Sequence, residues 1–335
     1  MIVVGVDGGS TKTVALVADA QGTVLGSARG GGSNWSGENV EVPMRVVAET
    51  VREAVRDAER NAQANARISP EDVALGMFTL AGADWPEDHT NRRAALEAAG
   101  IALKIVVKND SFGGLRAGTS KPYGMVLAAG SGMNAAVIAP DGQEWAFGYY
   151  ETFGGARTLA QDAFYAVLRA EDGRGLPTCL TQSVTQRLGF ETVEAMLRAW
   201  IAGTVDRRRF LAITPLVFEA ALAGDAVASE ILVHQGRGLA EYATAMARRF
   251  NMQQMEFDVV LAGSVFKGVG PLLVDTLTQE IHREAPFAKI IRARFEPVVG
   301  SVLLAYDALG IPVTDAMMEQ LARTVPTDSF FNTAA

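Results

Sequence analysis

The chain has 335 residues, of which 49% are hydrophobic and 20% charged, and its formal net charge is −8. This length accommodates two domains or one large one, with an apolar core that needs no disulfide or metal staple, and three histidines argue against a His-rich metal site. A single cysteine, Cys179, excludes a disulfide framework and a multi-cysteine zinc or iron–sulfur site within one chain, and the acidic balance argues against nucleic acid as a partner, because a sequence-independent grip on it needs a basic face.

The first residues carry neither the basic segment nor the cleavage site that is typical of a signal peptide. No uncharged apolar stretch reaches the roughly 18 residues that a membrane-spanning helix needs. We therefore expect a cytoplasmic protein with no membrane partner. In that setting Cys179 is expected to be a small, buried or otherwise inert thiol.

The first 28 residues predict a three-stranded meander. Apolar runs cover residues 2–6, 14–18 and 23–28, and the turn sequence DAQG at 19–22 separates the second run from the third. The elements predicted next are a glycine-rich loop at 30–34, a helix at 43–66, a short helix start at 69–72, a strand at 73–80, a helix at 87–99 and a strand at 101–107 that leads to Asn109 and Asp110.

The same order of strands and turns returns further along the chain. Strands predicted at 125–128, 135–139 and 144–148 are separated by a glycine turn and an acidic–glycine turn, which indicates an internal duplication. The remaining predicted elements are helices at 158–170, 181–188, 191–202, 207–223, 225–250 and 271–284, strands at 257–262 and 290–295, and two closing helices. Two such meanders among alternating strands and helices indicate an α/β protein of two similar lobes.

The first candidate site is the turn DGGSTKT at residues 7–13. Its glycine pair lets backbone N–H groups approach phosphate oxygens, Ser10 and Thr11 add hydroxyl donors, and Lys12 adds a cation. Asp7 could hold Mg²⁺ through water, since Mg²⁺ prefers one or two carboxylates plus waters. The spacing is not that of a Walker loop. The turn therefore predicts either a phosphate-binding loop or a tight polar hairpin.

Two further turns carry small residues. The turn GSGMN at 130–134 occupies the equivalent place in the second meander, and two such turns, one per lobe, could hold a polyphosphate from two sides; two ordinary hairpins are the alternative. In LAGSVFK at 261–267 a strand meets a helix. Small residues there permit a flat ring to lie against the backbone and the helix N-terminus favours anions, with a plain strand–helix turn as the alternative.

Asp110 follows a predicted strand and begins a predicted helix at 111–117. A carboxylate in that place could accept a proton from a substrate hydroxyl. Aspartate is also strongly favoured as the N-cap of a helix, and the residues taken alone favour this role for Asp110. Both roles are consistent with the sequence around this residue.

These features, in this order, resemble those of the actin/hexokinase/Hsp70 superfamily of ATP-binding proteins, and more closely those of its N-acetylglucosamine kinase branch, the BadF/BadG/BcrA/BcrD-type ATPases. The similarity covers nearly the whole chain. Its most specific pieces are VGVDGGSTKT at 4–13, ND at 109–110 followed by LRAG at 115–118, GSGMN at 130–134, AGSV at 262–265 and PVVGS at 297–301. It implies a two-lobed, ribonuclease H-like α/β fold with an ATP cleft between duplicated lobes at 1–116 and 117–311, and a C-terminal helix at 312–335 that completes the first lobe.

The resemblance also implies a role for each matching residue. Asp7 would organise Mg²⁺ through water, and Asp110 would be the general base that activates a sugar hydroxyl. The residues implied in ATP binding are Gly9, Ser10, Thr11 and Lys12 at the β- and γ-phosphates, Gly130, Ser131 and Gly132 in the second phosphate loop, and Gly263, Ser264 and Val265 at the adenosine. The residues implied in sugar binding are Ser33, Asn34, Trp35, Asp84 and Asn134.

One segment departs from the family pattern. Sugar kinases of this group usually carry Gly-Asp-Glu-Gly-Ser after the second meander, and its acidic residues bind sugar hydroxyls. Here the matching sequence is ETFGG, so Thr152 and Phe153 replace the acidic pair and Glu151 lies one position early. The loss of two hydroxyl acceptors predicts weaker binding of a hexose or an acceptor that is less polar.

The resemblance therefore predicts an ATP-dependent kinase that transfers the γ-phosphoryl group to a hydroxyl of an amino sugar such as N-acetylglucosamine or glucosamine. ATP and Mg²⁺ are its implied cofactors, and a homodimer is its implied assembly. The alternatives are an ATPase or regulatory switch without a sugar acceptor, and a pseudokinase that only binds nucleotide. The iron–sulfur activators of the same family bridge a cluster with two cysteines from each chain, which Cys179 alone cannot supply.

Overall fold

The computed structural model describes residues 1–34, 39–62, 67–150 and 153–331. The chain divides into two compact units, which we call unit 1 and unit 2. Unit 1 comprises Met1–Val126, Ala136–Tyr150 and Ile291–Ala335, and unit 2 comprises Leu127–Ala135 and Glu151–Ile290. Each unit is described by itself below. The lobe bounds at 116 and 311 stay a prediction.

Unit 1 contains a five-stranded sheet of order β3-β2-β1-β4-β5. Its strands are β1 (Ile2–Gly8), β2 (Thr13–Asp19), β3 (Val24–Gly30), β4 (Val73–Leu80) and β5 (Ile105–Asn109). The first three strands form an antiparallel meander, and β4 and β5 run parallel to β1. Because parallel strands end at the same edge, the residues that follow β1, β4 and β5 are brought together there, as in other open α/β sheets.

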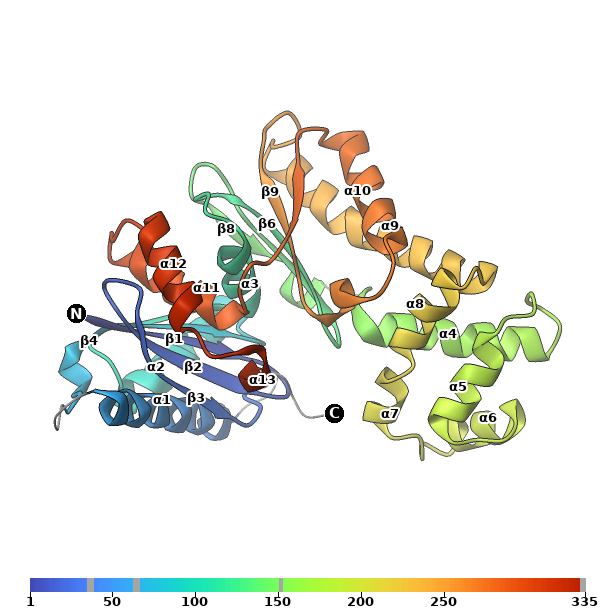
Figure 1. Cartoon of the computed structure of the whole chain (residues 1–335), viewed down its shortest axis with the longest axis horizontal. Helices are drawn as coiled ribbons and strands as arrows, with labels where there is room; N and C mark the ends of the chain where they lie inside the picture. Colours follow the sequence, from blue (N-terminus) through green and yellow to red (C-terminus); the bar gives the residue numbers. More distant parts are fainter. Residues whose placement is uncertain (35–38, 63–66, 151–152, 332–335) are drawn as a thin grey trace. The chain divides into compact units, whose positions relative to one another are not determined.

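Helices cover both faces of this sheet (Figure 1). On one face α1 (Glu41–Asn61) packs against β2 and β3, and α2 (Pro86–Ala98) packs against β5. On the other face α11 (Pro297–Ala308) packs against β1 and β4, with α3 (Asp110–Gly118) beside it. The helix predicted at 43–66 is confirmed as α1. Its buried side chains recur at helical spacing and form the core with the sheet; they include Val47, Val51, Ala54 and Ala58.

The end of the chain also belongs to unit 1. It forms α12 (Asp315–Thr324) and the single turn α13 (Asp328–Phe331), so three helices close the chain where two were predicted. The Thr324 hydroxyl accepts a hydrogen bond from the Val24 amide at 3.0 Å, and the carbonyl of Phe331 accepts one from the ammonium of Lys12. These contacts attach the C-terminal segment to the first meander.

The second sheet has the order β10-β9-β6-β7-β8. Its strands are β6 (Gly124–Ala129), β7 (Met133–Ile138), β8 (Glu144–Ala146), β9 (Asp258–Ala262) and β10 (Lys289–Arg292). The order is the same as in the first sheet, because each consists of a meander followed by two more strands on the side of its first strand. The predicted duplication of an α/β unit is therefore confirmed.

Apart from its residues in the second sheet, unit 2 is mainly helical. Its helices are α4 (Gly155–Glu171), α5 (Leu180–Leu188), α6 (Val193–Ile201), α7 (Arg207–Leu211), α8 (Thr214–Leu222), α9 (Ala226–Arg249) and α10 (Leu272–Glu284). The prediction of one helix at 207–223 was wrong, since the structure breaks it between α7 and α8. Pro215 in the first turn of α8 explains the break. Its ring would clash with the carbonyl four residues earlier, at Leu211, where α7 ends.

Within the described ranges, no single helix has both the length and the apolar composition to cross a membrane. One pair does meet that test when taken together. It joins residues 207–222 to α9 through a bend of 113°.

Cys179, expected to be a buried or otherwise inert thiol, is not buried. It is exposed at the N-cap position of α5. Partial burial and a hydrogen bond to the carboxylate of Asp225 raise the pKa of this thiol. A higher pKa means less thiolate at neutral pH, so the thiol is expected to be unreactive for an electrostatic reason.

Candidate functional site

Three acidic side chains and one lysine gather at the edge of the first sheet where its parallel strands end. Asp7 lies near the end of β1, Asp110 is the first residue of α3, and Glu296 directly precedes α11. The charges of all three acids interact, together with that of Lys12. Burial, followed by the negative charge of Asp110, raises the pKa of Asp7 to about 7, against the opposing effect of Lys12.

Glu296 is a member of this cluster that the sequence analysis missed. The motif identified there begins one residue later, at Pro297. The missed signal was an acidic residue directly before a proline that starts an apolar helix, a pattern that also fits an ordinary helix N-terminus.

The structure decides between the two roles considered for Asp110. The N-cap of α3 is Asn109, whose side-chain oxygen accepts a hydrogen bond from the amide of Ser111 at 3.0 Å. Asp110 is therefore not the capping residue, and the capping alternative was wrong. Its half-buried carboxylate lies instead within the electrostatic reach of Asp7.

Close contact between α3 and α11 positions Asp110 and Glu296. A Cβ on Gly300 would overlap the carbonyl oxygen of Gly113, so only glycine lets the two helices approach this closely. The pair is tied further by Arg116 in α3, whose Nε donates to Asp307 in α11 at 2.7 Å. Because both helices begin at the sheet edge, Asp110 at the start of α3 and Glu296 directly before α11 are held on the same side of it.

A buried hydroxyl pair joins α11 to the sheet beneath this cluster. The hydroxyls of Thr79 in β4 and Ser301 in α11 are 2.7 Å apart, and Thr79 also donates to the carbonyl of Val6 at 3.0 Å. Val6 directly precedes Asp7. The network therefore fixes the backbone of β1 one residue before the predicted magnesium ligand.

The first glycine turn is held by hydrogen bonds to the loop that the sequence analysis assigned to the sugar. The Gly9 amide donates to the carbonyl of Lys12 at 2.9 Å, and the Gly9 carbonyl accepts from the amides of Ser33 and Asn34 at 3.0 and 3.1 Å. The side chain of Asn34 also donates to the Ser10 hydroxyl at 2.8 Å. The predicted phosphate loop and the predicted sugar loop therefore form one unit of structure.

Ser33 differs from its neighbours in this loop because it is buried. Its hydroxyl accepts a hydrogen bond from Thr13 at 2.8 Å, a contact that favours a positioning role over direct contact with a ligand. Thr11 and Ser10 are exposed, and Gly9 and Lys12 are half-buried. Trp35, also predicted at the sugar, lies outside the described residues.

The second glycine turn is packed against the start of α4. The carbonyls of Gly130 and Ser131 accept hydrogen bonds from the amides of Ala156 and Arg157 at 2.8 and 3.1 Å. A Cβ on Gly155 would come within 2.5 Å of the carbonyl carbon of Gly132, so this approach also requires glycine. Ser131 is exposed at the tip of the turn, and the side-chain oxygen of Asn134 accepts from the Ala135 amide at 2.8 Å.

Unit 2 contains a cavity of about 360 Å³ that brings two of the predicted ATP motifs together. Ser131 of the second turn lines it together with Ser264 and Val265. Gly263 precedes them with φ of +98°, where a side chain would be strained. The sequence analysis missed the opposite wall, which is formed mainly by Leu211, Thr214, Pro215 and Phe218 of α7 and α8. Their apolar faces and the polar groups of the turns suit a flat heteroaromatic ring.

Asp84 lies in a separate cavity of about 280 Å³ within unit 1. Its carboxylate accepts a hydrogen bond of 2.6 Å from the side-chain amide of Asn109, so it is linked to the first turn of α3. Burial, followed by the charge of Asp88, raises the pKa of Asp84. The hydrogen-bond partner of Asp84, Asn109, directly precedes Asp110 in the chain.

Phe153, predicted from the resemblance to replace an acidic residue of the family pattern, packs within unit 2. Its ring meets that of His234 edge-on at 5.1 Å, and its backbone amide donates to the Tyr242 hydroxyl at 3.2 Å. A Cβ on Gly238 would overlap the ring, so a glycine in α9 makes room for it. The phenyl ring therefore packs against His234 and Gly238 of α9. Glu151 and Thr152 lie outside the described residues.

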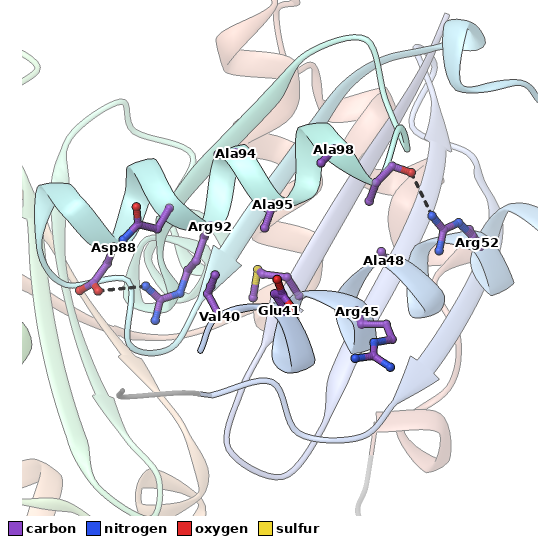
Figure 2. A pocket seen from close by; sticks show the side chains of 13 residues that line it. Val40, Glu41, Arg45, Ala48, Arg52, Asp88, Arg92, Ala94, Ala95 and Ala98 are labelled. Carbon is purple, nitrogen blue, oxygen red and sulfur yellow. Dashed lines mark hydrogen bonds and ion pairs between the residues drawn. The ribbon is translucent and has the colours of Figure 1, made fainter. Parts of the chain in front are cut away.

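A larger cavity, of about 760 Å³, lies between α1 and α2 (Figure 2), and none of the predicted site residues that the structure describes lines it. Arginines and alanines line it. Arg92 is paired with Asp88 at 3.2 Å, and Arg52 donates to the carbonyl of Ala99 at 2.9 Å. Size alone therefore does not identify the functional site.

A magnesium ion suits the surroundings of Asp7. No group of three or more His, Cys, Asp or Glu side chains is arranged around a metal position in the parts of the chain that the structure describes. Mg²⁺ does not require one, because it usually keeps several waters and binds through one or two carboxylates. Burial and the charge of Asp110 raise the pKa of Asp7 because both disfavour its ionised form. A bound cation would balance this negative charge and favour the ionised form again.

The chain was compared with known proteins. It is 25% identical over 326 residues to N-acetyl-D-glucosamine kinase of Dictyostelium discoideum, covering 92% of this chain and 98% of that protein. It is 25% identical over 307 residues to the N-acetylmuramic acid/N-acetylglucosamine kinase of Clostridium acetobutylicum, covering 90% and 97%. Among solved structures, a ROK family glucokinase from Streptomyces griseus has the same fold, with a TM-score of 0.58 at 17% identity, covering 92% of this chain and all of that one.

A candidate N-acetylglucosamine kinase from Chromobacterium violaceum shares the fold with a TM-score of 0.70 at 24% identity, covering 91% of this chain and 98% of that one. These similarities confirm the predicted fold class. The family model that describes the BadF/BadG/BcrA/BcrD ATPases matches residues 4–305. The chain therefore belongs to the BadF/BadG/BcrA/BcrD ATPase family.

Proposed function

We propose that this protein is an ATP-dependent kinase that transfers the γ-phosphoryl group to a hydroxyl of an amino sugar. The observation that carries the proposal is the carboxylate of Asp110, which does not cap α3 and lies beside Asp7 where the parallel strands end. The names of the two relatives from Dictyostelium discoideum and Clostridium acetobutylicum support an amino sugar as the acceptor.

The phosphates would be bound by the two glycine turns. Gly9, Ser10, Thr11 and Lys12 would bind the β- and γ-phosphates through backbone amides, hydroxyls and one ammonium group. The second turn, Gly130–Gly132, would add further amides, and Gly263, Ser264 and Val265 would contact the adenosine in the cavity of unit 2. Amides and a cation that are already oriented stabilise the charge of the transferring group without reorganisation.

Mg²⁺ would be held by Asp7 through water. When bound, the ion neutralises charge on the β- and γ-phosphates. Asp7 must be ionised to hold it, and the neighbouring Lys12 favours that form.

Asp110 would act as the general base. It would accept the proton of the acceptor hydroxyl while the hydroxyl oxygen bonds to the γ-phosphorus and the bond from that phosphorus to the β–γ bridging oxygen breaks, which releases ADP. Asn34, Asp84 and Asn134 would orient the sugar. Ser33 would hold the loop that carries Asn34 in place through its hydrogen bond with Thr13. Trp35 stays in the proposal as a sugar contact. We also propose a cytoplasmic homodimer.

The packing of Phe153 favours a second candidate, an ATPase or regulatory switch without a sugar acceptor. Its ring occupies a position where the family has an acid, and it is directed into contacts with α9. One experiment separates the candidates. ADP release is measured with Mg·ATP in the absence of acceptor and with glucosamine, N-acetylglucosamine, N-acetylmuramic acid and glucose in turn.

Release that only an amino sugar stimulates supports the kinase. Release that is independent of every acceptor contradicts it and supports the switch. Binding of ATP with no release under any condition contradicts both and identifies a pseudokinase. An Asp110→Asn variant measured in parallel shows whether any stimulated release depends on the proposed base.

A further inference from the structure

The cavity of about 760 Å³ between α1 and α2 has no part in the proposed function. Its volume lies within the range of small-molecule sites, roughly 300–1,000 Å³. Both helices belong to unit 1, so the cavity lies within one compact unit. Its lining combines small apolar side chains with charged ones, and the charged residues are Glu41, Arg45, Arg52, Asp88 and Arg92.

Two arginines of α1 form a basic end of the cavity. Arg45 and Arg52 are two helical turns apart, so they share one face of α1 at a separation of about 10 Å along its axis. Figure 2 shows both toward one end of the cavity and Arg92 with Asp88 toward the other. Ala48 lies between the two arginines, and its methyl group leaves space for both long side chains to reach the same ligand. The pair can therefore hold a single anion.

An anion can bind these two arginines without displacing an acid from them. Further along the same helix, Arg56 pairs with Glu53 at 2.7 Å. By contrast, neither Arg45 nor Arg52 forms an ion pair with any acid in the described ranges. A guanidinium has five N–H donors, and the hydrogen bond from Arg52 to the Ala99 carbonyl uses one of them.

The arginine at the other end of the cavity has a structural role instead. Arg92 is 1% exposed and pairs with Asp88 at 3.2 Å. The other carboxylate oxygen of Asp88 accepts hydrogen bonds from the amides of Asp84 and Trp85 at 3.2 and 3.0 Å. This ion pair holds the start of α2 in place. The positive charge that is available to a ligand therefore comes from Arg45 and Arg52.

A compact anion by itself would leave most of the cavity unfilled. Alanine side chains form much of the remaining wall and can pack against the apolar face of a small organic group; they are Ala48, Ala94, Ala95, Ala98 and Ala99. Glu41 can accept hydrogen bonds there, and Asn91 can both donate and accept them. The planar fork of arginine matches a phosphate group through paired hydrogen bonds. These features together fit a phosphate ester whose organic part carries hydroxyls.

We propose that the cavity between α1 and α2 is a second ligand site, which binds the phosphate monoester of a small polyhydroxylated molecule with its phosphate between Arg45 and Arg52. Sugar phosphates and nucleoside monophosphates share this chemistry. The site is distinct from the proposed catalytic one, because none of the described residues assigned to ATP, Mg²⁺ or the acceptor lines it. The inference does not depend on the kinase function.

The first test measures binding by calorimetry to the whole protein. The probes are glucose 6-phosphate, AMP, inorganic phosphate and, as the uncharged control, glucose. Saturating Mg²⁺ and a non-hydrolysable ATP analogue are present to fill the nucleotide site. We expect a phosphate ester to bind about ten-fold more tightly than inorganic phosphate, which cannot contact the alanine walls, and glucose to bind far more weakly than either ester. The tighter of the two esters identifies the sugar or the nucleoside as the preferred organic part.

The second test changes the arginines. Arg45→Ala and Arg52→Ala should each lower the affinity for the tighter ester by about ten-fold or more, because hydrogen bonds between charged partners are lost. Arg93→Ala is the matched control, since Arg93 is exposed in α2, pairs with Glu97 at 3.9 Å and does not line the cavity. Glu41→Gln should raise the affinity several-fold, because it removes a like charge from the lining.

The third test separates the phosphate from the organic part. Ala94 is exposed and lines the cavity, so Ala94→Leu fills space there with little effect on the core. This variant should bind the tighter ester about ten-fold more weakly and bind inorganic phosphate as wild type does. Thermal unfolding of each variant without ligand shows that the fold is retained.

Several results would overturn the proposal. One is the absence of binding by every phosphate probe, and another is binding that both arginine variants retain in full. An equal loss of affinity in Arg93→Ala would show that general surface charge, and not this cavity, attracts the phosphate. None of these measurements uses ADP release, so the second site and the kinase function can each fail while the other holds.

Discussion

Gly300 in α11 lies against the carbonyl oxygen of Gly113 in α3, with no space for a Cβ between them. Both helices start at the edge of the first sheet, and each carries an acid at that end, Asp110 in α3 and Glu296 before α11. The contact between two glycines therefore sets the separation of the acids. Helix packing at Gly113 and Gly300, away from the acidic side chains, therefore helps to set the positions of Asp110 and Glu296.

Gly300→Ala should lower both stability and activity. The added methyl group must push α11 away from α3, and overpacking of this kind usually costs about 1–3 kcal/mol. We expect a lower free energy of unfolding in urea and a kcat that falls more than stability alone explains. Gly31→Ala is the control, since no atom lies within 4 Å of its Cβ. Equal stability of the two variants would contradict the close packing.

Asp110→Asn should abolish phosphoryl transfer and spare nucleotide binding. General-base catalysis contributes roughly 10²–10⁴-fold to a rate, so kcat should fall by about that factor. The fold should be unaffected because Asn109, not Asp110, caps α3. Turnover is measured by ADP release, and nucleotide binding by thermal stabilisation with Mg·ATP. Near wild-type turnover in this variant would show that another group accepts the proton.

Asn109→Ala provides the contrasting change. It removes the cap of α3 and the partner of Asp84 together. The loss of an N-cap typically costs about 1 kcal/mol, so thermal stability should fall while Asp110 remains present. If unfolding by heat is unaltered in Asn109→Ala, the cap does not contribute to stability as the geometry indicates.

Asp7 should make stability depend on pH. Its pKa is about 7 in the folded protein against an ordinary value of 3.8, so the folded state binds a proton more tightly than the unfolded state between these pH values. The free energy of unfolding should therefore fall as pH rises from about 4 to about 7, by up to about 4 kcal/mol from this group. Asp7→Asn should lose this dependence and be more stable than wild type at pH 8, as measured by urea unfolding in EDTA.

If the free energy of unfolding instead rises between pH 4 and pH 7, and rises equally in wild type and in Asp7→Asn, the raised pKa of Asp7 is contradicted. Saturating Mg·ATP should reduce the difference between the two proteins at pH 8. The ion would then balance the charge that destabilises the wild type.

Cys179 should react slowly with thiol reagents although it is exposed. Partial burial and the hydrogen bond to Asp225 raise its pKa, and only the thiolate reacts. Asp225→Asn removes the negative charge but can still cap α9, where the native side chain accepts from the Ala228 amide at 2.9 Å. The rate of alkylation at pH 7.5 should rise several-fold in this variant. An unchanged rate would assign the slow reaction to access instead of charge.

The order of the secondary structure was predictable from the sequence, because it depends on local patterns. Apolar alternation identified both meanders, and helical spacing identified α1 and α9. The break between α7 and α8 was missed although its cause, Pro215, is in the sequence. The apolar pattern of the sequence continues through Pro215, so periodicity alone predicts one helix. The break comes from the backbone clash of the proline ring, which periodicity does not record.

The site was only partly predictable. Glycine turns, Asp7 and Asp110 were identifiable because their residue types suit phosphate and proton transfer at the ends of strands. The sequence could not assign the cap of α3 to Asn109, since both neighbours are good caps and only the backbone geometry selects one. It also could not associate Glu296, or Trp145, Phe147 and Tyr150 near Asp84, with these residues, because they are distant along the chain.

The sequence by itself determined the fold class, the duplication, the two glycine turns and the absence of a multi-cysteine site. These follow from residue counts, local periodicity and the backbone freedom of glycine. Only the tertiary structure decided the raised pKa of Asp7, the separation of α3 from α11 and the use of Phe153 as a packing residue. Each of these depends on burial or on distances between segments far apart in the chain, and neither quantity exists until the chain has folded.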